Sequence, residues 1–223
     1  AQEPIHLKIG VFNYISGAPL FIARDEGYFT EQGLDVELVD FGSTSNEIIP
    51  ALVARQLDAS VNSLSVSILN AISQGNNLKY VADKGFMNPE NCTTDAWVAS
   101  KTNLDSGAIA DPSTIKGKNV VFPPGGSIEY ALDVLLAQNG LTQEDVTTTN
   151  VADSAARVEG LKNGSIDVSV LSEPWITRAQ AAGAGEAWVP FSEIVPNMSL
   201  GVIIFGPGIL EDKPEAGARF MAA

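Results

Sequence analysis

The sequence predicts an α/β protein of two similar lobes, each formed by a mostly parallel β-sheet with helices on its faces. Short apolar segments alternate with amphipathic helical segments along the chain, which is the pattern of parallel strands joined by helices. The phrase LDASVNS at 57–63 recurs as IDVSVLS at 166–172, so the pattern is repeated in the second half. The chain has 223 residues, of which 45% are hydrophobic, and this is enough for two small lobes with their own cores.

The first half of the chain alternates strands and helices in a regular order. We expect strands at 6–12, 35–40, 58–62 and 78–82, and helices at 17–32, from about Thr44, and at 65–74. Gly33 is expected to end the first helix, because glycine readily adopts the left-handed conformation that follows many helices. The polar residues of GSTSN (42–46) are suitable caps for the second helix.

The second half repeats this order after a polar linker. We expect the linker at 103–118, strands at 118–122, 146–151, 166–171 and 186–191, and helices at 127–139, 153–163 and 173–182. Gly140 lies where Gly33 does, just after a helix. Asp58 and Asp167 precede buried strands in both halves, and we interpret them as structural residues. Trp97 and Trp188 lie in strand-like segments and are expected in the core.

Two segments are expected to connect the lobes. AWVAS (96–100) is interpreted as a strand that leaves the first lobe, and the apolar segment SLGVIIFG (199–206) as a strand that returns to the first sheet. The chain then crosses between lobes near 98–105 and again near 190–197. This predicts a first lobe of residues 1–100 and 192–223 and a second lobe of residues 101–191.

Composition excludes several classes of function. The 13 Lys and Arg against 27 Asp and Glu give a net charge of −14, which repels nucleic acid and anionic membrane surfaces. His6 and Cys92 are the single residues of their types, which rules out an internal disulfide and argues strongly against a His/Cys zinc site or a His-based triad. No window is long and apolar enough to span a membrane. We therefore predict no metal, no cofactor and no catalytic residue.

The N-terminal segment AQEPIHLKIG has neither a basic region nor an apolar one. Small residues flank the cleavage sites of secretory signals, so this start fits a mature N-terminus after signal removal. The same start also fits an arbitrary boundary. We favour export, with the signal peptide removed.

Candidate ligand-binding residues follow the strands. In open parallel sheets, ligands bind beyond the carboxyl ends of the strands, where the free N–H groups of helix N-termini favour acceptors and anions. Glycine allows close backbone approach and serine adds a small donor. The candidates chosen by this rule are Asn13, Tyr14, Ser16, Ser43, Thr44, Ser63, Ser65, Asp83, Gly125, Gly126, Ser127, Ser154, Glu173 and Trp175.

The same residues also fit purely structural roles. Serine and threonine at helix starts are common caps, and PPGG (123–126) is a common turn sequence. Glu173 at the start of a helix is favoured by the helix dipole without any ligand. Trp175, in the first turn of that helix, is harder to bury and is interpreted as a wall of the ligand cleft.

Four segments resemble the periplasmic solute-binding proteins of ABC importers, in the branch that binds nitrate, sulfonates, taurine and thiamine-pyrimidine precursors. They are 18–43, 50–61, 115–127 and 161–175. The most specific feature is Ala23 followed by Gly27-Tyr28-Phe29 on a helix, then Gly33-Leu34 and a Val-Glu pair. The resemblance covers nearly the whole chain.

This resemblance implies a type II clamp, with two lobes, two crossover connections and the ligand between the lobes. It also implies delivery to a membrane permease by a monomeric protein. Members of the family usually continue into C-terminal helices that complete the first lobe. Here the sequence ends at KPEAGARFMAA, so we expect the C-terminal part of that lobe to be incomplete. The residues that select the ligand in the branch match no single subgroup.

The charged and aromatic candidates favour a nitrogenous ligand over a bare anion. Cationic candidates are restricted to Lys84 and Arg157, whereas an anion site usually contains a buried cation. Carboxylates and aromatic rings are more numerous: Asp83, Glu129, Asp153, Glu173, Tyr14, Phe86, Tyr130 and Trp175. These suit a pyrimidine-like heterocycle or an amine. A sulfonate, taurine or nitrate ligand stays open, as does an enzyme on the same fold that uses Asp/Glu acid–base chemistry.

Overall fold

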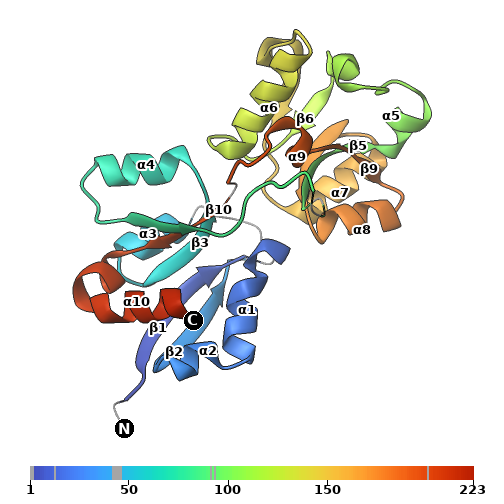
Figure 1. Cartoon of the computed structure of the whole chain (residues 1–223). Coiled ribbons are helices and arrows are strands. Elements are labelled where there is room, and N and C mark those ends of the chain that lie inside the picture. Colours follow the sequence, from blue (N-terminus) through green and yellow to red (C-terminus); the bar gives the residue numbers. More distant parts are fainter. Residues whose placement is uncertain (1–2, 13, 42–46, 91, 93, 200) are drawn as a thin grey trace. The chain divides into compact units, whose positions relative to one another are not determined.

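The computed structural model (Figure 1) describes residues 3–12, 14–41, 47–90, 92, 94–199 and 201–223. The chain divides into two compact units, the first formed by residues 1–85 and 199–223 and the second by residues 86–198. The predicted boundaries at 100 and 191 were therefore misplaced, since the chain enters the second unit earlier and leaves it later.

The first unit contains a five-stranded sheet in the order β2-β1-β3-β10-β4. Its strands are β1 (Ile5–Val11), β2 (Leu34–Asp40), β3 (Ala59–Ser63), β4 (Lys79–Asp83) and β10 (Gly201–Phe205). β1 is parallel to β2 and β3, while β10 lies antiparallel between β3 and β4. The prediction that the apolar segment near 199–206 returns to the first sheet is confirmed.

The second unit contains a five-stranded sheet in the order β7-β6-β8-β5-β9. Its strands are β5 (Asp95–Ser100), β6 (Asn119–Val121), β7 (Thr147–Thr149), β8 (Val168–Ser172) and β9 (Gly185–Pro190). β5 lies antiparallel between β8 and β9. The assignment of 96–100 to the first lobe was therefore wrong. The strand is buried on both faces of the second sheet, with Trp97 and Val98 fully inaccessible to solvent.

The two sheets share one topology. In each, four parallel strands are interrupted by one antiparallel strand at the fourth position, which β10 occupies in the first unit and β5 in the second. The repeated aspartates also make the same contact, since each accepts a hydrogen bond from a backbone N–H of the neighbouring strand segment. Asp58 Oδ2 accepts a hydrogen bond from the Lys8 backbone N–H at 2.8 Å, and Asp167 Oδ2 accepts one from the Asn119 backbone N–H at 2.8 Å. The predicted similarity of the lobes and the structural role of both aspartates are confirmed.

The helices of the first unit are shorter than expected. They are α1 (Ala18–Asp25), α2 (Tyr28–Glu31), α3 (Ile48–Val53), α4 (Val66–Ser73) and α10 (Pro214–Ala222), with a 3₁₀ turn at Ile15–Gly17 and a π-helical turn at Gly208–Asp212. The single helix predicted at 17–32 is interrupted by Gly27, whose φ of 84° lies in the left-handed region. The predicted helix start at Thr44 lies outside the described residues.

The helices of the second unit follow the prediction more closely. They are α5 (Lys101–Asp105), α6 (Ser127–Gln138), α7 (Ser154–Asn163), α8 (Trp175–Ala181) and α9 (Phe191–Ile194), with 3₁₀ turns at Pro112–Ile115 and Gln143–Asp145. The segment 103–118, predicted as a linker, is folded into the unit. Ile109 and Ile115 are buried, and their side chains anchor this otherwise polar segment to the core of the unit.

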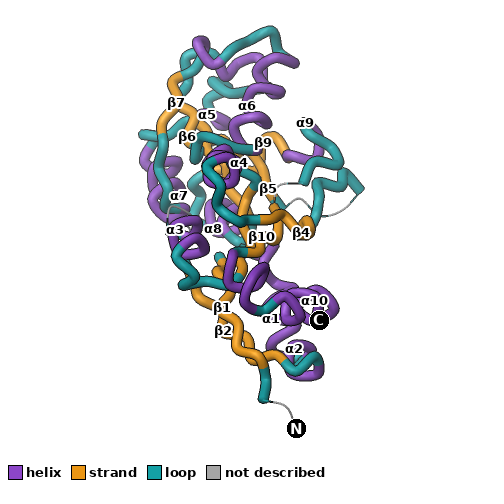
Figure 2. Tube along the Cα trace, turned by 90° about the vertical axis from the view of Figure 1, so that its left-hand side faces the viewer, coloured by secondary structure: helices purple, strands orange, loops and turns teal. Residues whose placement is uncertain are grey.

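Each sheet is covered on both faces (Figures 1 and 2). In the first unit, α1, α2 and α10 pack on one face around Phe29 and Phe220, whose rings stack at 5.4 Å. α3 and α4 pack on the other face around Leu52 and Ile68. In the second unit, α7 and α8 cover one face, and the opposite face holds Trp97, a core residue as predicted. Because both faces of each sheet are packed, the carboxyl ends of its strands are held in fixed positions within the unit.

Candidate functional site

The carboxyl edge of the first sheet brings together the candidates that follow β1, β3 and β4. The antiparallel register places Gly201, the first residue of β10, at this same edge, opposite Ser63. The candidates described at this edge are Tyr14, Ser16, Ser63, Ser65 and Asp83. Asn13, Ser43 and Thr44 lie outside the described residues. The strand-end rule thus selected one continuous edge of this unit.

A lysine lies at this edge. Lys84 Nζ donates a hydrogen bond to Ser16 Oγ at 2.9 Å, and the Lys84 backbone N–H donates one to the Gly201 carbonyl at 3.0 Å. A Cβ at Gly201 would lie 1.7 Å from Lys84 Cε. Glycine is therefore required at 201 for the lysine side chain to cross β10 and reach Ser16.

The other candidates of the first unit have local partners or exposed side chains. Ser65 Oγ and Ser67 Oγ are 2.9 Å apart, and Asp83 Oδ1 accepts a hydrogen bond from the Gly85 backbone N–H at 3.0 Å. Ser63 is exposed, and the ring of Tyr14 lies near that of Phe12. This edge therefore offers hydroxyls, one carboxylate and one ammonium to a solute.

In the second unit, the loop before α6 is hydrogen-bonded to a carboxylate in the first turn of that helix. Gly125 has a φ of 87°, which the glycine permits, and its N–H donates to Glu129 Oε2 at 2.7 Å. Ser127, the first residue of the helix, is 8% exposed, and no hydrogen-bond partner of its Oγ was found within the described part of the chain. Gly126 precedes it in an extended conformation. An acceptor at this helix start has to compete with Glu129 for the loop amide.

At the start of α7, a buried arginine occupies the serine hydroxyl that was a candidate for ligand binding. Ser154 is 1% exposed, and its Oγ accepts a hydrogen bond from Arg157 Nη2 at 2.8 Å. Arg157 Nη1 donates to the Val170 carbonyl of β8 at 2.8 Å, and Asp153 Oδ1 accepts from the Ala156 N–H. The guanidinium therefore links α7 to β8. Arg157, which sequence reasoning offered as a ligand-binding cation, is used inside the unit.

Glu173 and Trp175 also have structural contacts at the start of α8. Glu173 accepts hydrogen bonds from the Thr177 backbone N–H at 3.2 Å and from Thr177 Oγ1 at 3.0 Å. The guanidinium carbon of Arg178 lies 4.5 Å from the centre of the Trp175 ring, which is half-buried against the core. These contacts favour the helix-start interpretation of Glu173, since its carboxylate caps the first turn.

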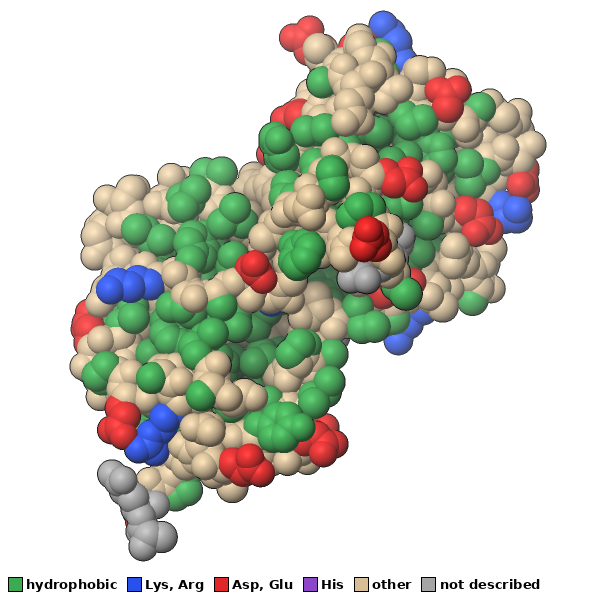
Figure 3. All heavy atoms as spheres, in the orientation of Figure 1, with side chains coloured by type: hydrophobic (Ala, Val, Ile, Leu, Met, Phe, Trp, Pro, Cys, Tyr) green, Lys and Arg blue, Asp and Glu red, His purple; other side chains and the backbone are tan. Residues whose placement is uncertain are grey.

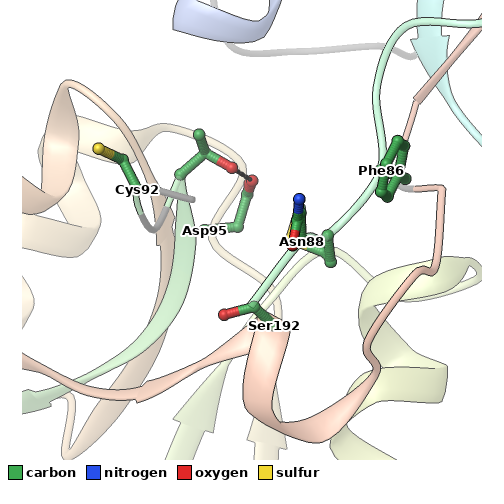
Figure 4. Close-up of a pocket in the computed structure, with 7 residues that line it drawn as sticks. Phe86, Asn88, Cys92, Asp95 and Ser192 are labelled. Atoms are coloured by element: carbon green, nitrogen blue, oxygen red, sulfur yellow. Dashed lines mark hydrogen bonds between the residues drawn. The ribbon is translucent and has the colours of Figure 1, made fainter. Parts of the chain in front are cut away.

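A cavity of about 110 Å³ lies within the second unit (Figure 4). It is lined by Phe86, Met87, Asn88, Cys92, Thr94, Asp95 and Ser192. Asp95 pairs with Ser172 at the carboxyl end of β8, so the cavity lies at the carboxyl edge of the second sheet. Asp95 Oδ1 accepts a hydrogen bond from Ser172 Oγ at 2.5 Å, and Oδ2 accepts one from Thr94 Oγ1 at 2.7 Å.

Sequence reasoning missed Asp95, Asn88 and Ser192. The strand-end rule considers residues that follow parallel strands, whereas Asp95 begins an antiparallel strand whose amino end reaches the same edge. The rule finds Asp95 once β5 is known to lie beside β8. The sequence signal that was available is a carboxylate directly before the apolar run AWVAS.

The described residues include no group of three or more His, Cys, Asp or Glu that could hold a metal ion. In the same part of the chain, no helix is long and apolar enough to cross a membrane. On the face shown in Figure 3, acidic side chains are spread out and the Lys and Arg side chains lie apart from one another. This face shows no concentration of positive charge among the described residues.

A sequence model of the NMT1-like family matches the chain over residues 1–223. The chain belongs to the NMT1-like family. A curated protein of Haemophilus influenzae named "Putative thiamine biosynthesis protein" is 26% identical over 170 residues, which are 76% of this NMT1-like chain and 50% of that protein. The chain thus spans half the length of this curated relative.

Solved structures show the fold of this NMT1-like protein. The zinc-bound ligand-binding component of an ABC-type import system from Staphylococcus aureus matches with a TM-score of 0.80 and 16% identity, over 97% of this chain and 71% of that one. The alkanesulfonate-binding protein SsuA from Xanthomonas axonopodis pv. citri, bound to MOPS, matches with a TM-score of 0.77 and 20% identity, over 99% and 72%. The protein has the fold of the periplasmic binding proteins.

Proposed function

We propose that this NMT1-like protein is the solute-binding component of an ABC-type importer, which binds a small organic solute and delivers it to a membrane permease. The observation that carries the proposal is the duplicated binding-protein fold, which extends over the whole chain and ends its strands in polar loops in both units. Backbone N–H groups, hydroxyls and a few charged groups suit reversible binding of a polar solute.

The preferred ligand class is a nitrogenous heterocycle, such as a pyrimidine, or an amine. Arg157 holds a carbonyl and a hydroxyl of its own unit, whereas Asp95 lines a cavity. Carboxylates beside aromatic rings bind cations and N–H donors. The name of the Haemophilus relative, which refers to thiamine biosynthesis, also supports this class.

A sulfonate-type anion is the second candidate. Lys84 at the first edge and the N-terminus of α6 in the second unit are the groups that favour it. The name of the alkanesulfonate-binding neighbour also supports it. Under this alternative, neutralising Lys84 weakens binding, whereas under the preferred class the same change has little effect.

A thermal-shift screen tests the function and separates the two classes. The panel contains aminopyrimidines, flavin-like heterocycles, polyamines, taurine, alkanesulfonates, nitrate and bicarbonate. A ligand at about 1,000 times its dissociation constant adds about 4 kcal/mol to the unfolding free energy, or about 10 °C for a chain of this size. A shift with heterocycles or amines supports the preferred class, a shift with sulfonates or nitrate alone supports the second, and no shift with any solute contradicts the proposal.

A binding protein returns its ligand unchanged, whereas an enzyme of the same fold converts it. Mass spectrometry of the solute recovered after long incubation distinguishes these two cases. We further propose that the protein acts as a monomer outside the cytoplasmic membrane, in the periplasm or facing the exterior. Cell fractionation of the natural protein and light scattering of the purified one test these statements.

A further inference from the structure

We infer that the cavity of the second unit is a subsite for a protonated amine or an N–H-bearing nitrogen group of the solute, with Asp95 as its acceptor. This inference rests on the proposed function, because it names the part of the solute that the second unit recognises. Figure 4 shows Cys92 and Asp95 on one side of the cavity and Phe86 on the other.

The hydrogen bonds of Asp95 leave its negative charge in place. Among the described residues, both donors to the carboxylate are neutral hydroxyls, from Ser172 and Thr94. The ion pairs found among the described residues do not include Asp95. A carboxylate has about four acceptor positions, so two hydroxyl donors leave room for further N–H donors. The described part of the site therefore contains no cationic group beside Asp95, and a solute can supply one.

The carboxylate is also held in place by the sheet. Asp95 is paired with Ser172 in the β5–β8 ladder, and the Glu173 backbone N–H donates to the Thr94 carbonyl at 2.8 Å. These backbone bonds fix both hydroxyl donors relative to the carboxylate. A group fixed in this way loses little freedom when the solute binds, which favours affinity.

The size of the cavity limits what enters it. A volume of about 110 Å³ is smaller than the roughly 150 Å³ of a cavity that accommodates benzene. An amino or amidine group fits this space, whereas a complete ring system exceeds it and extends towards the mouth. Phe86 lines the cavity and is 55% exposed, so its ring can contact a flat heterocycle or a cation.

A metal ion or an anion fits the cavity less well. Cys92 and Asp95 are the metal-ligating side chains of its lining, and the described residues form no cluster of three such groups. An anion is repelled by Asp95 and finds no Lys or Arg among the lining residues. The polar groups Asn88 and Ser192 instead provide amide and hydroxyl contacts to a neutral part of the solute.

Calorimetry with two matched probes tests the subsite. 4-Aminopyrimidine carries an N–H donor that 4-methoxypyrimidine lacks. We expect Asp95→Asn to weaken binding of the amino probe about ten- to a hundredfold, which is the usual effect of losing a hydrogen bond to a charged group, and to leave the methoxy probe nearly unchanged. Asp105→Asn, an exposed residue of α5, makes the same charge change as a control. Equal binding of the amino probe by wild type and Asp95→Asn overturns the inference.

The thiol of Cys92 provides a test that needs no ligand. Cys92 is exposed and lines the cavity. Its thiolate attacks a methanethiosulfonate, so a mixed disulfide forms and methanesulfinate leaves. We expect the trimethylammonium-ethyl reagent to react several-fold faster than the sulfonatoethyl reagent, relative to a small free thiol. This preference should fall in Asp95→Asn but not in Asp105→Asn, and it should shrink at ~1 M salt.

The outcomes separate the subsite from the proposed function. If the thermal screen finds sulfonates alone and Asp95→Asn changes neither binding nor labelling, the function stands and the subsite is wrong. If the screen finds no solute, the function fails, and an unchanged labelling ratio in Asp95→Asn also refutes the electrostatic basis of the subsite. Loss of both the amino-probe affinity and the labelling preference supports the inference.

Discussion

Asp58 is expected to be among the most important polar residues for the stability of the first unit. Its Oδ2 accepts a hydrogen bond from the Lys8 N–H, and its Oδ1 lies 3.0 Å from Lys213 Nζ. The side chain of Asp58 is 11% exposed and that of Lys213 is 34% exposed. The carboxylate thus ties β1 and β3 to the segment that leads into α10. The variant Asp58→Ala removes both contacts at once.

The expected size of the destabilisation follows from the two contacts that are lost. Leaving the strand N–H of Lys8 without its acceptor costs about 1–3 kcal/mol. The lost ion pair adds about 0.5–1 kcal/mol, a small value because Lys213 is partly solvated. The total is about 1.5–4 kcal/mol, which corresponds to a fall in Tm of roughly 4–12 °C. Asp58→Asn keeps one acceptor and should lose about half as much.

Hydrogen exchange and thermal unfolding together check this prediction. The amide of Lys8 should lose protection in Asp58→Ala while the amides of β6 in the second unit do not. The matched variant Asp167→Ala should show the reverse, because Asp167 accepts from the Asn119 N–H and from Asn103 Nδ2 in the second unit. A change below about 0.5 kcal/mol in Asp58→Ala, the range of ordinary surface substitutions, contradicts the reasoning.

Three further predictions follow from contacts near the strand edges. Gly201→Ala should displace the Lys84 side chain from Ser16, because the added methyl group occupies the position of the lysine chain. The displaced amine should then react faster with trinitrobenzenesulfonate than the amine of the unchanged protein, and an equal rate would contradict this. Arg157→Ala should lower the unfolding free energy by about 2–4 kcal/mol, because it removes the buried hydrogen bonds to the Val170 carbonyl and Ser154 Oγ and leaves a cavity. Urea titration that shows no loss would contradict this. Burial raises the pKa of the Tyr80 phenol, so its neutral form contributes stability below the unfolded pKa of about 10, and this contribution is lost as pH rises through the folded pKa. Absorbance at alkaline pH should show a late-titrating component that Tyr80→Phe removes.

Several features of this protein could be predicted from its sequence because their causes are local. The alternation of strands and helices follows from apolar periodicity, and the repeated phrase around Asp58 and Asp167 predicts two similar units. The carboxyl edges of the parallel strands, and the candidates that lie on them, follow from the same pattern. The break at Gly27 was missed, although glycine is a common signal for the end of a helix.

Other features depend on contacts between segments far apart in the sequence. An apolar strand buried on both faces, such as β5, carries no local mark of the sheet that it joins, so only its pairing with β8 and β9 places Asp95 at the cavity. In the sequence alone, a structural arginine cannot be distinguished from a ligand-binding one, because its partners are unknown. In the structure, Arg157 donates hydrogen bonds to the Val170 carbonyl and to Ser154 Oγ. Local sequence thus determined the repeated units and their polar edges. The tertiary structure decided which charges of those edges are used internally and which line a cavity, because that outcome depends on long-range pairing of strands and side chains.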